Sequence, residues 1–327
     1  MAIKKYFSPK NYINNFRQLL KNSVSFAFTP LELWLSQRYG EQGINSYPPI
    51  FIIGAPRCGS TLLYKVLTER YNLIFFSNFT AALPKISVCA TWAERKLGIK
   101  APPGNYTSQY GYVEGLGSPN ESAEFWYRWF PRGLRVYVPP KSTRLETLME
   151  LRHEIGAMSY IGCGSMIFKN LYNSMRLAPI IEAIPEASFI ICKRDFTANA
   201  LSILKGRIIN MKDKNTWWSV PTKDIESLLK KDFAQQVVGQ VYYIIKQIFD
   251  DRQQFGEERF LEVQYEEFCT DVDGTLRKIK KFLEQRGVAL KEKNEVPTSF
   301  EITSDVTGVD PSDCRKVEQA AALQLKE

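Results

Sequence analysis

Residues 50–63 read Ile50-Phe51-Ile52-Ile53-Gly54-Ala55-Pro56-Arg57-Cys58-Gly59-Ser60-Thr61-Leu62-Leu63. The apolar run 50–53 predicts a buried strand, Gly54 and Gly59 predict a tight turn, and a helix is expected from Ser60 onward. In such a turn, successive backbone N–H groups point inward at a helix N-terminus and form a site for phosphate or sulfate. Arg57 adds a fixed positive charge. The sequence therefore predicts an anion-binding loop rather than a plain turn between a strand and a helix.

The spacing Gly54-x4-Gly59 matches the first part of the P-loop pattern G-x-x-x-x-G-K-[ST], but Ser60 stands where that pattern has lysine. An NTPase needs this lysine on the β- and γ-phosphates, together with a hydroxyl and a distant aspartate for Mg²⁺. The cation has moved to Arg57, inside the loop. A nucleotide kinase or NTPase with Mg²⁺-dependent ATP turnover is therefore an alternative that the missing lysine disfavours.

A second segment, 188–193, reads as a buried strand that runs directly into Arg194 and Asp195. Open α/β sheets bind ligands beyond the carboxyl ends of their strands, where Arg194 is expected. Ser202 follows eight residues later, about two turns into the next predicted helix. Arg194 and Ser202 would together bind a second anion, although this segment alone favours a simple pair between Arg194 and Asp195.

Taken together, the two segments resemble the sulfotransferase family, which uses 3′-phosphoadenosine 5′-phosphosulfate. The family's first signature is similar to Pro56-Arg57-Cys58-Gly59-Ser60-Thr61, and its second has an arginine at a strand end with a serine eight residues later, as in Arg194 and Ser202. A third, weaker likeness is the run 260–267, which resembles a strand ending in Tyr-Glu-Asp. The resemblance covers roughly residues 49–286.

This resemblance implies a mainly parallel α/β fold of the P-loop type and a set of cofactor-binding residues. The 5′-phosphosulfate loop would comprise Arg57, Cys58, Gly59, Ser60, Thr61 and Leu62. Arg194 and Ser202 would hold the 3′-phosphate, and Tyr265 would lie near the adenine. Arg315 and Lys316 are the nearest match to the family's late Arg-Lys-Gly anchor. The chain departs from the family with Cys58 for serine, Leu62 for an adenine-stacking tryptophan, and Val317 for the anchor's glycine.

The chemistry implied is in-line transfer of a sulfuryl group to a hydroxyl or amine of a small-molecule, lipid or sugar acceptor, in which the protein supplies positioning and charge stabilisation. Arg57 would stabilise the leaving phosphate, helped by Lys169 at the end of a predicted strand. A sulfuryl group carries less charge than a phosphoryl group, so no metal is expected.

The acceptor must lose a proton, so a base is needed. Leu171 stands where many cytosolic members carry a catalytic histidine. Glu121 is the predicted base instead, with Glu124 and the only histidine, His153, as weaker candidates.

Composition sets wide limits. The 327 residues suit one large α/β domain, and 43 basic against 35 acidic residues give a net charge of +8. This excess suits a bisphosphorylated nucleotide, nucleic acid or an anionic membrane surface. A non-catalytic binder of single-stranded nucleic acid is a second alternative. It is disfavoured because the aromatic residues of 80–140 lie among Gly and Pro rather than Lys and Arg, so no nucleic-acid partner is expected.

Strand and helix patterns alternate from residue 50 onward, which predicts a mainly parallel sheet covered on both faces. We expect strands at 50–54, 73–77, 165–169, 188–193 and 259–264. We expect helices at 60–70, 145–158, 173–184, 197–206, 225–254 and 275–286.

The predicted organisation is a helical extension over 1–47, an α/β domain over 48–295 with an acceptor-side insertion at 80–140, and a tail over 296–327. The extension interleaves Lys4, Lys5, Lys10, Arg17 and Lys21 with apolar residues. A helix packed on the flank of the domain is favoured over a membrane-surface helix, which stays open. No spanning run or secretory leader is evident. The six scattered cysteines contain no C-x-x-C pair, which indicates a reducing, cytoplasmic environment.

Overall fold

The computed structural model describes residues 9–104, 106, 114–303 and 306–326, with side chains from residue 21 onward. Lys4 and Lys5 of the predicted basic extension lie outside the described residues, as do the side chains of Lys10 and Arg17.

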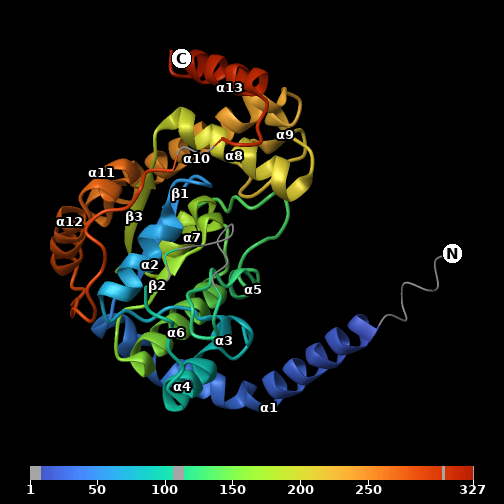
Figure 1. Cartoon of the computed structure of the whole chain (residues 1–327). Helices are drawn as coiled ribbons and strands as arrows, with labels where there is room; N and C mark the ends of the chain where they lie inside the picture. Colours follow the sequence, from blue (N-terminus) through green and yellow to red (C-terminus); the bar gives the residue numbers. More distant parts are fainter. Residues whose placement is uncertain (1–8, 105, 107–113, 304–305, 327) are drawn as a thin grey trace.

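A four-stranded parallel sheet lies at the centre of the fold (Figure 1). Its strands are β1 (Ile50–Gly54), β2 (Ile167–Lys169), β3 (Ser188–Lys193) and β4 (Phe260–Gln264), in the order β2-β1-β3-β4. The predicted α/β class and parallel sheet are therefore confirmed.

The prediction of a strand at 73–77 is wrong, because the structure has no strand there. Ile74 makes only an isolated parallel bridge with Met166, and Ser77 makes an isolated antiparallel bridge with Pro119. Beyond the bridge at Ile74 the chain turns into the short helix α3 (Asn78–Ala81), because the hydroxyl of Ser77 caps this helix by accepting a hydrogen bond from Thr80 N at 3.1 Å.

Each strand places one phenylalanine in the same row across the sheet. Phe168, Phe51, Phe189 and Phe260 stand in register on β2, β1, β3 and β4, with neighbouring ring centroids 5.0–5.3 Å apart. These rings belong to the larger hydrophobic core. The alternate residues, such as Ile52 and Ile190, face a second core on the other side. Both faces are buried, as expected for a parallel sheet.

The helices agree with the predicted pattern at α2 (Ser60–Arg70) and differ elsewhere in their ends. The helix expected at 173–184 is a 3₁₀ turn, η2 (Leu171–Met175), followed by α7 (Leu177–Ala183). The helix expected at 225–254 is divided into α9 (Ile225–Leu228) and α10 (Phe233–Phe255), because Asp232 caps a new helix by accepting hydrogen bonds from Ala234 N and Gln235 N. The remaining helices are α4 (Ser87–Leu97), α5 (Ala123–Trp126), α6 (Leu145–Gly162), α8 (Phe196–Met211), η3 (Glu257–Arg259), α11 (Tyr265–Thr270), α12 (Val272–Gln285) and α13 (Pro311–Gln324).

The helices that follow β1 and β3 cover opposite faces of the sheet. Helix α2 packs its Leu63 and Leu67 into the core that contains Ile52, whereas α8 packs Ile203 and Leu204 into the core that contains Phe51. The two chain paths diverge at the carboxyl ends of two adjacent strands. In open α/β sheets such a divergence opens a crevice for ligands.

The first and last helices of the chain pack against the helices that cover the sheet. Helix α1 (Pro9–Ser46) packs along α6, and α13 packs against α10 and α8. The contact of α1 with α6 is close, because a Cβ at Gly43 would come within 1.7 Å of the main-chain oxygen of Gly156. No helix in the described part of the chain is both long and apolar enough to cross a membrane.

Candidate active site

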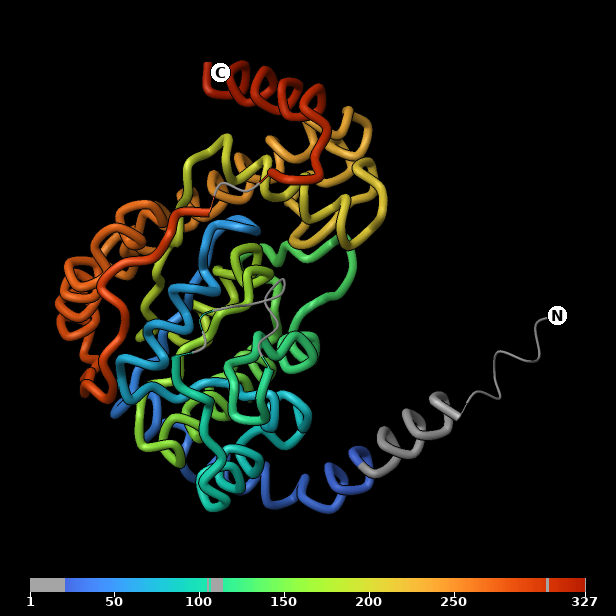
Figure 2. Tube along the Cα trace, viewed as in Figure 1, coloured from blue at the N-terminus to red at the C-terminus, as the bar shows by residue number. Residues whose placement is uncertain are grey.

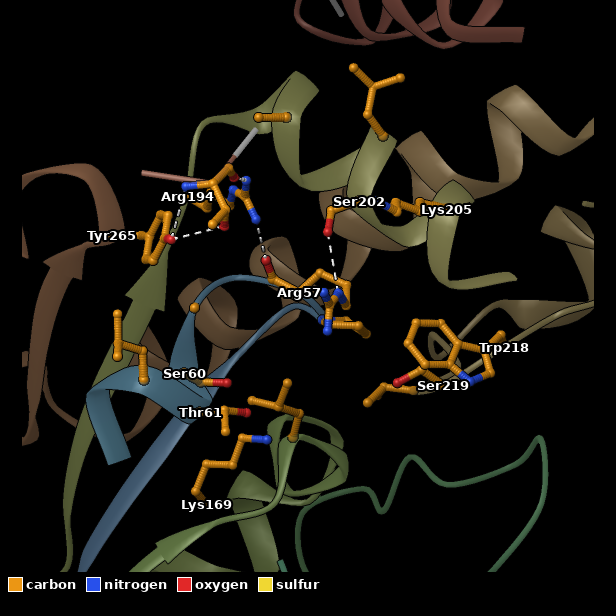
Figure 3. A pocket seen from close by; sticks show the side chains of 18 of the residues that line it. Arg57, Ser60, Thr61, Lys169, Arg194, Ser202, Lys205, Trp218, Ser219 and Tyr265 are labelled. Carbon is orange, nitrogen blue, oxygen red and sulfur yellow. Dashed lines mark hydrogen bonds between the residues drawn. The ribbon is translucent and has the colours of Figure 1, made fainter. Parts of the chain in front are cut away.

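A cavity of about 700 Å³ lies at the divergence of β1 and β3 (Figure 3). Its volume is within the range usual for small-molecule and cofactor sites. The lining residues come from the loop after β1 and the start of α2, the segment before α5, the end of β2 with η2, the end of β3, helix α8, the loop before α9, the start of α11, and the segment after residue 299. They include Arg57, Gly59, Ser60, Thr61, Leu62, Tyr106, Glu121, Lys169, Leu171, Tyr172, Arg194, Ser202, Lys205, Trp218, Ser219, Val220, Tyr265, Phe300 and Thr303.

The loop after β1 has the backbone of an anion nest. Arg57 and Gly59 both have left-handed φ angles, 68° and 89°, and Gly59 is the N-cap of α2. Tyr265 packs under this glycine so closely that a Cβ there would lie 2.2 Å from Tyr265 Cδ2. Ser60 and Thr61 occupy the first two positions of α2, where backbone N–H groups have no intrahelical partner, and both residues line the cavity.

Two buried side chains fasten this loop to its neighbours. Ser174 Oγ accepts a hydrogen bond from Gly54 N at 3.1 Å and donates one to Gly54 O at 3.0 Å. Asn199 on α8 donates from Nδ2 to Pro56 O at 2.5 Å. The loop is thereby held against the helix that carries Ser202.

The two predicted arginines meet at one end of the cavity. Arg57 Nε donates to Ser202 Oγ at 3.2 Å, and Arg194 Nη1 donates to the main-chain oxygen of Arg57 at 3.2 Å. Arg194 also donates from Nη2 to Thr303 O and lies over the Tyr265 ring, 5.0 Å from its centroid. The pair of Arg194 with Asp195 that the segment alone favoured is not formed, because Asp195 caps α8 by accepting from Ala198 N at 2.8 Å.

At the other end of the cavity, the buried Lys169 and the partly exposed Glu121 form an ion pair. Lys169 Nζ contacts Glu121 Oε1, and Lys169 is only 5% exposed. Asn170 donates from Nδ2 to the main-chain oxygen of Glu121 at 3.1 Å, which holds the loop that carries Glu121 against the end of β2. Leu171 and Tyr172 continue the wall. The structure thus brings together a cation and a carboxylate that lie 48 residues apart.

Burial raises the pKa of the tyrosines that line the cavity still further above neutral pH, where a phenol is already protonated. Desolvation raises the pKa of Tyr172 to about 12, and it also raises that of Tyr265. Both phenols therefore remain hydrogen-bond donors in the physiological range. Tyr265 Oη lies 3.2 Å from Thr303 Oγ1.

Several predicted residues lie elsewhere. His153 is on α6 and faces α1, with Nε2 3.4 Å from Glu41 Oε1, so the structure does not bring this candidate base to the cavity. Glu124 is exposed and pairs with Arg132. Neither side chain lines the cavity, because His153 on α6 contacts Glu41 of α1 and Glu124 on α5 contacts Arg132.

The residues predicted as the late anchor also lie away from the cavity. Arg315 and Lys316 lie on α13 outside the cavity lining, and Lys316 Nζ is 5.8 Å from the Phe233 ring centroid. Cys58 belongs to the loop, but its side chain is fully buried in the core below and only its neighbours line the cavity.

Some lining residues were not predicted. Lys205 follows Ser202 by three residues on α8, so the helical period places it on the same face. This spacing was a usable signal. By contrast, Phe300 and Thr303 come from the segment predicted as a tail, and nothing local in the sequence indicates that this segment returns to the cavity. Trp218 and Ser219 come from the loop 208–224, which the sequence, with its paired Trp217 and Trp218, predicts to lie near the cofactor side.

Among the described residues, no three His, Cys, Asp or Glu side chains gather so as to hold a metal ion. The expectation of metal-independent chemistry stays a prediction.

The arrangement defines a class: a parallel α/β protein with a P-loop-like anion nest and a second arginine–serine pair at the same cavity. The model of the Sulfotransferase family matches residues 48–287, and the chain belongs to this family. The chain is thus a transferase enzyme, a sulfotransferase. The kinase and nucleic-acid-binding alternatives are set aside by this membership.

The chain is also similar, at low identity, to several solved structures. The chain is similar to sulfotransferase STF9 from Mycobacterium avium (13% identity, 86% of this chain and 69% of that chain covered, TM-score 0.48). It is also similar to sulfotransferase STF1 from Mycobacterium tuberculosis H37Rv (14%, 89% and 76%, TM-score 0.47) and to a sulfotransferase from Alicyclobacillus acidocaldarius (17%, 85% and 93%, TM-score 0.42). All three TM-scores are below 0.5, so the family membership rests on the family model. A search of curated proteins finds no significant match.

Proposed function

We propose that the chain transfers a sulfuryl group from 3′-phosphoadenosine 5′-phosphosulfate to a hydroxyl or amine. The observation that carries this proposal is the meeting of Arg57 and Arg194 at one cavity, linked by the hydrogen bond from Arg194 Nη1 to Arg57 O. A nucleotide with a phosphate at each end of its ribose needs two cationic subsites in one cavity, and this pair supplies them.

The residues present fit such a nucleotide. Arg194 Nε is buried and has no hydrogen-bond partner among the described residues, so one donor of this guanidinium is available to an anion. The nest at Gly59, Ser60 and Thr61 would hold the 5′ end, and Arg194 with Ser202 would hold the 3′-phosphate. Tyr265, between Gly59 and Arg194, would lie beside the nucleoside. We propose Lys205 as a third cation for the 3′ side, in place of Arg315 and Lys316.

Bound in this way, the donor supplies the sulfuryl group, and adenosine 3′,5′-bisphosphate is the by-product. Arg57 would stabilise the negative charge that develops at the 5′ end. Glu121 Oε1 would accept the proton of the acceptor. Lys169, in contact with both the cavity and Glu121, would orient that carboxylate and add positive charge near the reacting atoms.

The acceptor is proposed to be a small molecule, lipid or sugar with an apolar portion. The cavity has a largely apolar wall close to Glu121 and Lys169, formed by Leu171, Tyr172, Trp218 and Val220.

We also propose a cytoplasmic location, supported by the scattered cysteines, all of which are free thiols. Cell fractionation against a cytoplasmic marker tests this location.

Calorimetric titration tests the donor. We expect adenosine 3′,5′-bisphosphate to bind at least ten times more tightly than AMP, because only the bisphosphate engages Arg194 and Ser202. ATP, titrated with and without Mg²⁺, serves as the second control. Equal affinities for AMP and the bisphosphate would contradict a 3′-phosphate site.

A further inference from the structure

Over residues 24–36, helix α1 buries polar side chains and exposes apolar ones, which is the opposite of what an amphipathic helix on a protein surface usually does. The side chains that face the body are polar: Ser25, Glu32 and Ser36, spaced seven and four residues apart, are 6%, 4% and 9% exposed. The large apolar side chains face solvent instead. Phe26 is 84% exposed, and Trp34 is 55% exposed.

This orientation is held by a specific contact. The two carboxylate oxygens of Glu32 accept hydrogen bonds from Val88 N and Cys89 N, both at 2.8 Å. These N–H groups belong to the first turn of α4, whose own N-cap residue, Ile86, makes no side-chain cap. Glu32 therefore caps α4 from another helix. Turning α1 to bury its apolar side would break this cap, so the apolar face is a stable feature of the fold.

The exposed side includes a continuous stripe. Val24, Ala27, Leu31 and Trp34 are spaced three, four and three residues apart, which places them on one face opposite Ser25 and Glu32. Upstream, the sequence continues the same spacing at residues 20, 16 and 13, which are Leu, Phe and Ile. In Figure 2 the first blue turns of the tube, from residue 21, lie out to one side of the body.

Charge indicates what covers this face. The sequence before Glu32 contains five basic residues, Lys4, Lys5, Lys10, Arg17 and Lys21, and no acidic residue. Two copies of this helix packed together would bring like charges close with no acidic partner for them. An anionic surface complements the same charges, and a helix with aromatic residues on its apolar side is suited to the boundary between headgroups and acyl chains.

We propose that the apolar face of α1 over residues 24–34, with its basic upstream flank, binds the surface of an anionic lipid bilayer. The helix lies in the plane of the interface and does not span it. This binding places the enzyme at a membrane independently of its donor and acceptor.

Vesicle cosedimentation of the full chain tests the proposal. Vesicles of phosphatidylcholine alone are compared with vesicles containing 30% phosphatidylserine, a mixture that gives an anionic surface. We expect at least tenfold tighter binding to the anionic vesicles, lost at high salt because the charges are screened. Phe26→Gln with Trp34→Gln is expected to weaken binding at least tenfold, as is the triple change Lys10→Gln, Arg17→Gln and Lys21→Gln. Leu323→Gln, an exposed leucine on α13, is the matched control and is expected to bind like the parent.

Other results overturn the proposal. Binding that is absent, or that is equal for the parent and the Phe26→Gln/Trp34→Gln variant, shows that this face does not contact lipid. Analytical ultracentrifugation tests the alternative that a second copy of the chain binds this face. A dimer that dissociates in the same double variant, without vesicle binding by the parent, assigns the face to a second copy of the chain. Circular dichroism of each variant verifies that the fold is intact.

Discussion

Arg194 Nη1 donates a hydrogen bond to the main-chain oxygen of Arg57, 3.2 Å away, although the two residues are 137 positions apart in the chain. One arginine thus holds the backbone of the loop in which the other stands. Asn199 anchors the same loop one residue earlier, at Pro56 O, and Ser202 on the same helix accepts a hydrogen bond from Arg57 Nε. The cavity is therefore preorganised for a ligand that carries negative charge at two points.

Replacing Arg194 by Ala is expected to reduce the affinity for adenosine 3′,5′-bisphosphate by roughly 10- to 100-fold, since hydrogen bonds to charged groups contribute about 1.5–3 kcal/mol. The affinity for AMP should change much less. Calorimetric titration measures both. Arg135→Ala, at an exposed arginine paired with Glu226, is the control. Equal losses for the two nucleotides would mean that Arg194 only supports the loop.

Glu121→Gln is expected to lower kcat by about 10²- to 10⁴-fold, the usual contribution of a positioned general base. Glutamine keeps an oxygen that can accept from Lys169 but does not take up the acceptor's proton. Binding of adenosine 3′,5′-bisphosphate should be unchanged. Glu124→Gln, three residues away and outside the cavity, provides the comparison. Full turnover by Glu121→Gln would remove Glu121 as the base.

Gly59→Ala tests the nest itself. Alanine pays about 1–2 kcal/mol to adopt the left-handed φ of 89°, and its Cβ would also meet the Tyr265 ring at 2.2 Å. Gly98→Ala is the matched control. It has only the free-energy cost of placing alanine at a left-handed φ, because nothing lies within 4 Å of a Cβ at that position. Both variants should unfold at lower temperature than the parent, Gly59→Ala more so. Only Gly59→Ala should lose nucleotide affinity, by at least tenfold, and a similar loss in Gly98→Ala would contradict this role of the loop.

Asp251 on α10 is expected to make stability depend on pH. Its burial raises the pKa of the carboxyl from 3.8 to about 7. Between about pH 4 and pH 7 the folded chain holds a proton that the unfolded chain has released, so this residue's contribution to stability decreases as pH rises through that window. Asn carries no charge and still accepts from Gln247 Nε2.

Asp251→Asn should therefore raise the melting temperature relative to the parent at pH 8, with the difference vanishing below about pH 4. The linked free energy is at most about 4 kcal/mol, at about 1.4 kcal/mol per pKa unit. Thermal unfolding across this pH range measures it, with Asp273→Asn, at an exposed aspartate in the first turn of α12, as control. A difference that does not change with pH would disprove the raised pKa.

The local features of the fold were predictable from the sequence. The strand at 50–54, the turn with Gly59 and the helix at 60–70 follow from a short apolar run, two glycines and an amphipathic stripe, all within about twenty residues. The same holds for the strand ending before Arg194. Where a capping side chain intervened, as at Asp232, the predicted helix was too long, since such a cap competes with the continuing apolar pattern.

The sequence by itself predicted the class of fold, the turn of the anion nest, and the places of Arg57, Arg194 and Ser202 just beyond strand ends, because each of these depends on local periodicity and turn residues. The contacts that join the three residues span more than 130 positions and were decided by the tertiary structure. The tertiary structure alone decided that Thr303 returns to Arg194, that Lys169 meets Glu121, that His153 and Arg315 face other surfaces, and that α1 turns its apolar side outward. These arrangements are set by how distant segments pack together, and packing of that kind leaves no local periodicity in the sequence.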